Sequence, residues 1–175
     1  MLCPYQRIKK ASEDKKIMLV TIITVGTLKE DYLKDATAEY KKRLSQYARV
    51  DEVNLKEERI RDEDDESERA RALNAEADRI IDALPKDATK IALCVEGVQY
   101  DSLGLSRVIG EAVDRGGKIA LVIGSSHGLS ERVKKECSLR LSVSKMTLPH
   151  QLMRVVLMEA LYRSFTILAG KRYHK

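Results

Sequence analysis

The sequence predicts an α/β protein with a mainly parallel sheet flanked by helices. Short runs of β-branched and apolar residues alternate with longer segments whose apolar residues recur every three or four positions. Several of the short runs are apolar throughout, as strands are when helices cover both faces of a parallel sheet. No internal repeat and no Gly-, Pro- or Ser-rich linker divides the 175 residues, so we expect one domain.

The first half of the chain is expected to hold two strands and two helices. The strands are expected at residues 17–25 and 50–55, and the helices at 30–47 and 70–84. The first strand is uncharged and ends at Gly26, whereas Pro85 stops the second helix. Lys56–Glu68, between the second strand and the second helix, is the most polar stretch of the chain. It is interpreted as a solvated loop or the acidic first turn of a helix.

The second half continues the same alternation. Strands are expected at 90–95, 118–123 and 139–143, and helices at 105–113, 131–137 and from about 150 to 168. The strand at 90–95 is expected to end before Gly97. Loops follow all three strands, and ligands of parallel α/β proteins bind at such carboxyl ends. The loops at 124–130 and 144–149 are rich in Gly, Ser and Thr, which allow a ligand to approach the backbone.

The last helix is apolar on most of its sides between Leu152 and Phe165. Such a helix must be buried on most of its sides. We expect a second copy of the chain to cover its outer face, which predicts a homodimer with twofold symmetry. A helix buried entirely within one chain is the alternative.

Composition and motifs exclude several classes of protein. The longest apolar run, Ile17–Val25, is far shorter than the roughly 20 residues that span a bilayer, so we expect no membrane protein. The three cysteines form no CxxC pair and the three histidines lack metal-ligand spacing, so we expect no metal. The phosphate-binding patterns GxxxxGK[ST] and GxGxxG are absent, and the N-terminus lacks a signal sequence. A cytoplasmic protein is therefore the expectation.

Positive charge is concentrated near the C-terminus. Residues 133–175 carry nine basic and two acidic side chains, whereas residues 71–132 are nearly neutral. A basic segment of this kind suits a polyanionic partner such as nucleic acid.

The C-terminal motifs are specific. Leu139-Arg-Leu-Ser-Val-Ser-Lys-Met-Thr-Leu-Pro-His-Gln-Leu-Met-Arg154 resembles the signature of the RlmH family, the ribosomal RNA large subunit methyltransferases H of the SPOUT superfamily. Glu159-Ala-Leu-Tyr-Arg163 and the terminal Tyr173-His174-Lys175 are similar to further motifs of that family. The resemblance extends from about Met18 to Lys175. We therefore expect a single SPOUT domain at 18–175, preceded by an extension at 1–17, with Met18 as the natural initiator.

The resemblance implies a C-terminal trefoil knot, a homodimer and an enzyme that uses S-adenosylmethionine to methylate N3 of a pseudouridine in 23S rRNA, on the assembled ribosome. Carried over by position, the residues that contact the cofactor are Leu93, Gly124, Ser125, Val143, Ser144, Lys145, Met146, Thr147 and Leu148. The implied catalytic residues are His174, Tyr173 and Arg154, and the implied RNA contacts are Arg163 and Lys175.

These residues suggest a mechanism in which the roles of some residues are undecided. The acceptor nitrogen must lose a proton, and a histidine, with an ordinary pKa of about 6.5, suits that task. We predict that His174 acts across the dimer, while Arg154 is either catalytic or structural. Ser125 replaces one of the family's paired glycines, where a side chain could crowd the cofactor, and Cys94 replaces the family's usual Asp. A SPOUT enzyme for another RNA, such as tRNA, and a cofactor-free RNA-binding module are the alternatives.

Overall fold

The apolar runs pair into one five-stranded sheet in which every neighbouring pair of strands is parallel. The structure, a computed structural model, describes residues 18–171. The strands follow the order β2-β1-β4-β3-β5 across the sheet. Their bounds are β1 Met18–Val25, β2 Ala48–Leu55, β3 Thr89–Gln99, β4 Lys118–Ile123 and β5 Leu139–Ser142. The predicted α/β class and parallel sheet are confirmed.

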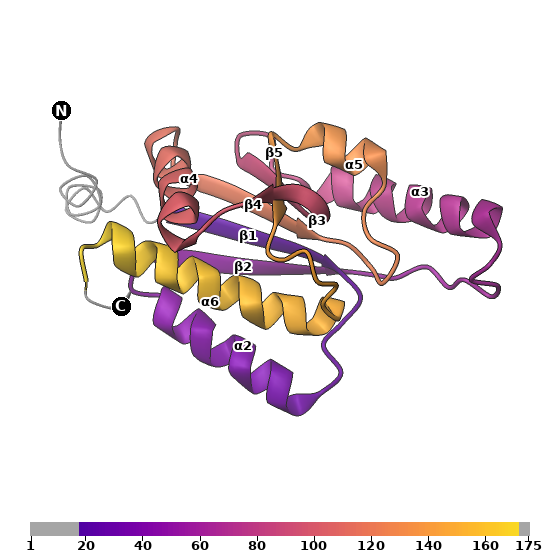
Figure 1. Cartoon of the computed structure of the whole chain (residues 1–175), viewed down its shortest axis with the longest axis horizontal. Coiled ribbons are helices and arrows are strands. Elements are labelled where there is room, and N and C mark those ends of the chain that lie inside the picture. The colour runs from indigo at the N-terminus through magenta and orange to yellow at the C-terminus, as the bar shows by residue number, and fades with distance from the viewer. Residues whose placement is uncertain (1–17, 172–175) are drawn as a thin grey trace.

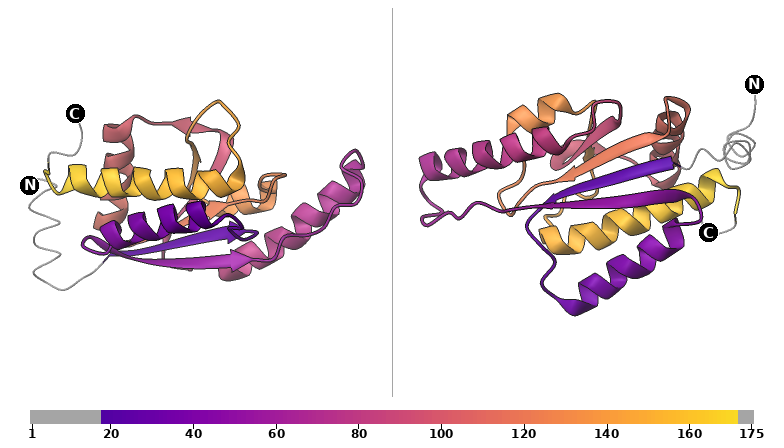
Figure 2. Two further views of the ribbon diagram at one scale, coloured as in Figure 1. Left: turned by 90° about the horizontal axis from the view of Figure 1, so that it is seen from below. Right: turned by 180° about the vertical axis from the view of Figure 1, so that it is seen from behind.

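Five helices within residues 18–171 cover the two faces of this sheet (Figure 1). Their bounds are α2 Asp31–Leu44, α3 Glu66–Ala83, α4 Ser102–Asp114, α5 Glu131–Glu136 and α6 His150–Leu168. Helices α2, α4 and α6 pack on one face, and α3 and α5 pack on the other. Helix α3 projects beyond the end of the sheet (Figure 2). None of these helices is long and apolar enough to cross a membrane.

Alternation along the strands divides the core in two. In β1, Val20 and Ile22 face α2, α4 and α6, whereas Ile23 and Val25 face α3 and α5. Strand β4 alternates in the same way, so successive side chains enter opposite layers. Both layers are apolar, which explains why these strands are continuous apolar runs in the sequence.

The N-terminus of α3 explains the acidic segment at 62–66. Asp65 caps the helix, because its carboxylate accepts hydrogen bonds from the amides of Ser67 and Glu68. Glu66 and Glu68 lie in the first turn, where negative charge interacts favourably with the helix dipole. Both interpretations of this segment are correct, because 62–65 form an exposed loop and 66–68 form the acidic first turn.

Strand β3 is longer than the sequence predicts. Its pairing with β5 shifts register between Leu93 and Val98, and the strand then continues to Gln99. A Cβ atom at Gly97 would lie 2.6 Å from the carbonyl carbon of Leu141, so only glycine allows β5 to approach here. The prediction that this strand ends before Gly97 is wrong, because the glycine marks a bulge within the strand.

Helix α6 lies beneath the middle of the sheet, between α4 and α2 (Figure 1). Its buried side chains include Leu157, Leu161 and Phe165, while Leu152 is 38% exposed. Much of its apolar surface is therefore covered within one chain, in agreement with the alternative considered for this helix. The predicted trefoil knot and homodimer stay predictions.

Candidate functional site

A pocket lies at the carboxyl ends of β3, β4 and β5, where ligands bind in parallel α/β proteins. Its volume is about 360 Å³, within the usual range for small-ligand sites. Leu93 and Glu96 of β3 line one side, and the segments 123–129 and 141–148 line the others. His150 and Met153 close it from the first turn of α6. We call this cavity the main pocket.

The loop after β4 needs a glycine at its start. A Cβ atom at Gly124 would lie 2.0 Å from the carbonyl oxygen of Gly128, because the loop folds back on itself. The amide of Gly128 donates to the carbonyl of Ser125, and Gly128 adopts a φ of +85°. The sharp turn holds the backbone of residues 124–128 against the main pocket.

The loop after β5 is held by serine side chains. Ser142 donates its hydroxyl hydrogen to the carbonyl of Ser144, and the hydroxyl oxygen of Ser144 accepts from the amide of Met146 at 2.9 Å. These local bonds fix the loop without using the backbone of Thr147 or Leu148, which also line the pocket.

The sequence locates this pocket well. Eight of the nine residues predicted to contact a cofactor line it, from three separate segments of the chain. They are Leu93, Gly124, Ser125, Val143, Ser144, Met146, Thr147 and Leu148. Lys145 belongs to the same loop but is exposed and does not line the pocket.

One departure from the family pattern has a clear structural consequence. The side chain of Ser125 is buried, and its hydroxyl donates to Glu76 of α3 at 2.9 Å. Glu76 does not line the main pocket, so the hydroxyl is directed away from the space that a ligand would fill.

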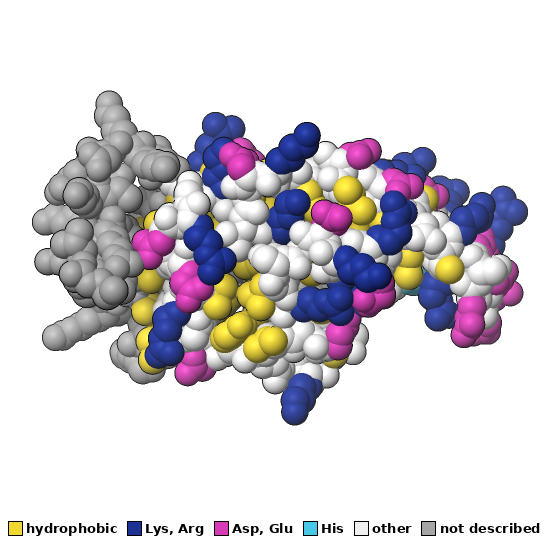
Figure 3. Space-filling view, turned by 90° about the horizontal axis from the view of Figure 1, so that it is seen from above, with side chains coloured by type: hydrophobic (Ala, Val, Ile, Leu, Met, Phe, Trp, Pro, Cys, Tyr) yellow, Lys and Arg dark blue, Asp and Glu magenta, His cyan; other side chains and the backbone are white. Residues whose placement is uncertain are grey.

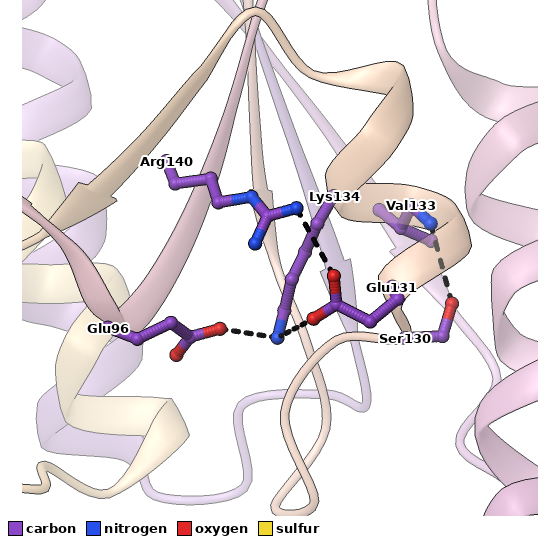
Figure 4. A network of polar contacts seen from close by, with 6 residues as sticks. All are labelled: Glu96, Ser130, Glu131, Val133, Lys134 and Arg140. Carbon is purple, nitrogen blue, oxygen red and sulfur yellow. Dashed lines mark hydrogen bonds and ion pairs between the residues drawn. The ribbon is translucent and has the colours of Figure 1, made fainter.

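Lys134 of α5 lies at the centre of an ionic network beside the pocket (Figure 4). Its ammonium group contacts Glu96 of β3 and Glu131 of its own helix, and Arg140 of β5 contacts Glu131 at 3.2 Å. Burial alone would lower the pKa of Lys134, but the bonds to Glu96 and Glu131 outweigh it and raise that pKa. The bond to Lys134 likewise lowers the pKa of Glu96. The network fixes α5 against the bulged part of β3.

Cys94 lines the same side of the pocket. Burial raises the pKa of its thiol, and the neighbouring charge of Glu96 raises it further. The thiol is thus protonated at neutral pH and adds no negative charge to the main pocket.

Arg154 is buried behind the pocket, with 3% of its surface exposed. Its guanidinium donates to the side-chain carbonyl of Asn54 at 2.8 Å and to the backbone carbonyl of Gly26 at 2.5 Å. Burial lowers its pKa. Arg154 does not line the main pocket, and its contacts join α6 to the carboxyl ends of β1 and β2.

Of the other predicted residues of the C-terminal region, the structure describes Arg163, which is separate from the pocket. Arg163 lies ten residues after Met153, which is about 15 Å along a helix, and pairs with Glu159 at 2.6 Å. Tyr173, His174 and Lys175 lie outside the described residues.

A second, polar hollow of about 800 Å³ adjoins the main pocket. The two share Ser126 and His127, and Glu57, whose carboxylate accepts a hydrogen bond from the hydroxyl of Ser126 at 3.5 Å, also lines the hollow. A third, smaller hollow reaches from Glu57 to His150, which also lines the main pocket. The main pocket therefore opens toward a broad polar surface on which a second, larger substrate can lie.

Sequence reasoning missed part of this site. Lys134, Glu96 and Glu76 gave no local signal, because Lys134 contacts Glu96 across 38 residues and Glu76 contacts Ser125 across 49. His150 gave a signal, since it follows Pro149 at a helix start, but that position suits capping equally well. Among residues 18–171, no group of His, Cys, Asp and Glu side chains is arranged to hold a metal ion.

Comparison with known proteins identifies relatives of the whole described region. Residues 18–174 match the family described as "Predicted SPOUT methyltransferase". The chain is 46% identical to ribosomal RNA large subunit methyltransferase H of Bacillus thuringiensis subsp. konkukian and 43% identical to that of Streptococcus gordonii. Each match covers 90% of this chain and the whole of the relative. The solved structure of a probable methylase family protein from Haemophilus influenzae Rd KW20 shares the fold, with a TM-score of 0.52 and 16% identity over 89% of this chain and 70% of that one.

Proposed function

Since the chain belongs to the SPOUT methyltransferase family, and its relatives are ribosomal RNA large subunit methyltransferases H, we propose that it methylates 23S rRNA at N3 of a pseudouridine, using S-adenosylmethionine. The observation that supports this best is the main pocket. Eight of the nine residues assigned to the cofactor by resemblance converge on it from three segments of the chain. The names of the relatives favour ribosomal RNA over tRNA, and family membership disfavours a cofactor-free RNA-binding module.

The pocket fits the proposed cofactor in shape and in chemistry. Gly124 allows the loop after β4 to fold tightly, and Leu93 and Leu148 offer apolar surface for a planar base. Backbone groups of the loops at 124–128 and 143–148 are placed to bind its polar atoms. When bound, S-adenosylmethionine supplies an activated methyl group, so the chief task of the chain is to position the acceptor.

The acceptor base is proposed to enter from the polar hollow. His127 and His150 lie where the hollows meet the main pocket, and Glu57 lines both hollows. On the face of the molecule that Figure 3 shows, basic side chains are scattered among acidic ones. Phosphate contacts are proposed from Arg163 and Lys175.

The proton acceptor is proposed to come from a second subunit, and the length of α6 supports this. The helix starts at the main pocket and continues for 19 residues, roughly 28 Å. Four more residues after Lys171, even if fully extended, reach about 14 Å. This length favours a tail that acts in the other subunit, and we propose that His174 deprotonates the base in the partner's site, with Tyr173 stacking on the base or hydrogen-bonding to it.

The proposed homodimer has apolar surface available to it. Large apolar side chains are exposed on the end of β3, on α4, on the loop after β5 and on α6. They are Val95, Val98, Tyr100, Leu103, Met146 and Leu152. Burying such side chains between two chains would stabilise a dimer. We place the dimer with the ribosome in the cytoplasm.

Isothermal titration of the full chain with S-adenosylmethionine is the first test. We expect one site per chain. Ribosomes from a strain that lacks this methylation should then gain one methyl group on a 23S rRNA pseudouridine, which mass spectrometry of nuclease fragments would locate. Methylation of tRNA instead, or RNA binding without any cofactor binding, would refute the proposal.

A further inference from the structure

We propose that Glu76 is a positioning residue, which holds the cofactor loop in place through the side chain of Ser125. This inference rests on the proposed function, because it concerns how the main pocket is kept open for S-adenosylmethionine. It identifies a residue on α3, outside every motif that the sequence offered for the site.

Glu76 is a charged residue in an apolar layer. It is 4% exposed and lies beside Ala77 and Ile80, which belong to the core between α3, α5 and the sheet. A buried carboxylate is costly unless hydrogen bonds satisfy its oxygens. Here each oxygen accepts one: Oε2 from the hydroxyl of Ser125 at 2.9 Å, and Oε1 from the amide of Glu58 at 3.0 Å.

The bond to Ser125 determines where that side chain points. A serine hydroxyl can occupy three rotamers. The bond to Glu76 favours the rotamer that turns away from the main pocket, and it anchors the residue at the start of the turn 125–128. The pair therefore keeps the side chain of residue 125 bound on the far side instead of occupying cofactor space.

The second oxygen of Glu76 extends this role to the neighbouring surface. Glu58 lines the polar hollow together with Glu57, and the amide of Glu58 is held by the same carboxylate that holds Ser125. One buried side chain thus links the loop that lines the main pocket to the segment that lines the hollow beside it. Losing the carboxylate would leave both donors without this acceptor, which is unfavourable for any donor that stays buried.

A double-mutant cycle tests the inference in the full chain. We expect Glu76→Ala to weaken S-adenosylmethionine binding about tenfold when Ser125 is present. In the Ser125→Gly background, the same change should weaken binding less than threefold, because no hydroxyl remains to be held. Glu76→Gln should bind within about threefold of the unchanged chain, since its amide can accept from Glu58 and donate to Ser125. Its kcat at saturating cofactor should stay within twofold.

Matched controls separate positioning from general stability. Asp82→Ala changes an exposed carboxylate on the same helix and should leave binding unchanged. Hydrogen exchange in the absence of cofactor should show faster exchange at the amide of Gly128 in Glu76→Ala than in Asp82→Ala. An equal loss of binding in both position-125 backgrounds, or unchanged exchange at Gly128, would overturn the inference. Failure of the unchanged chain to bind S-adenosylmethionine would overturn the proposed function instead, and the exchange result would still decide whether Glu76 holds the loop.

Discussion

Arg154 belongs to the C-terminal motif but does not line the main pocket. Its guanidinium lies among neutral acceptors, the amide of Asn54 and the carbonyls of Val25 and Gly26. These acceptors stand at the carboxyl ends of β1 and β2, beside the first turns of α6. The position suits a residue that fixes α6, and with it His150 and Met153, against the sheet.

Replacing Arg154 should therefore reduce stability. We expect Arg154→Ala to lower the free energy of unfolding by about 2 kcal/mol, because it leaves buried carbonyls without a donor and opens a cavity. Urea denaturation measures this. Arg163→Ala, on the same helix but half-buried, should cost about 1 kcal/mol or less. Full stability combined with lost methyl transfer in Arg154→Ala would support the catalytic interpretation instead.

The two thiols of the described region should differ in how a ligand protects them. Burial raises the pKa of Cys137 from 9.0 to about 11, so at pH 8 it holds about a hundredfold less thiolate than a free cysteine. Alkylation of Cys137 should be correspondingly slow at pH 8 and should accelerate as the pH rises toward 11. Cys94 lines the main pocket, so S-adenosylmethionine should slow its alkylation and leave that of Cys137 unchanged. Peptide mass spectrometry distinguishes the sites, and equal protection of both thiols would contradict this prediction.

At the scale of elements, the junction of β3 and β5 is the least tolerant point of the sheet. The bulge brings the backbone of β5 against Gly97, where a methyl group would lie 2.6 Å from one backbone carbon and 2.8 Å from another. Backbone cannot yield as a flexible side chain does. The same bulge places Cys94 to Glu96 beside the main pocket, so sheet geometry and site geometry are joined here.

We expect Gly97→Ala to lower the free energy of unfolding by about 3 kcal/mol through overpacking. Gly110→Ala is the matched control. Its added methyl group would meet only the end of the Leu168 side chain, at 3.1 Å, and alanine favours a helix by about 1 kcal/mol over glycine. Thermal unfolding should give a clearly lower midpoint temperature for Gly97→Ala than for Gly110→Ala. Equal midpoint temperatures would show that β5 can move away from the added methyl group.

The sequence predicted elements better than the contacts between them. Every strand and helix of the described region was expected, because each has a local apolar period or an uninterrupted apolar run. Strand β3 was the main error, since a bulge at Gly97 and a strand end at Gly97 look the same in one sequence. The partners of α6 were also missed, because apolar side chains indicate burial without indicating which element covers them.

The candidate site was also predictable from the sequence only in part. Loops at the carboxyl ends of parallel strands are a general rule, so the main pocket could be located, and the resemblance supplied residues such as Leu93 and Gly124. Neither source pointed to Glu76 or Lys134, because an acidic or basic residue on a helix usually faces solvent. Their burial depends on the tertiary structure, which places Ser125 beside Glu76 and Glu96 beside Lys134.

At the scale of the whole molecule, α6 separates the two parts of the proposed active site. The helix begins at the main pocket and ends about 28 Å away, next to the four C-terminal residues. We therefore propose that each chain contributes its tail to the pocket of another chain. Under this proposal, dimerisation serves catalysis as well as stability.

Heterodimers provide the decisive measurement. We would combine a chain with Gly124→Val, which blocks the cofactor loop, with a chain carrying His174→Ala, and purify the heterodimer through two different tags. Each homodimer should be inactive. The heterodimer has one site that joins an intact pocket to an intact tail, so it should methylate ribosomes at about half the rate of the unchanged dimer. If each tail served its own pocket, both sites would carry a defect and the heterodimer would be inactive. A mixture of Gly124→Val with a chain lacking both functions controls for residual activity, and it should be inactive under either arrangement.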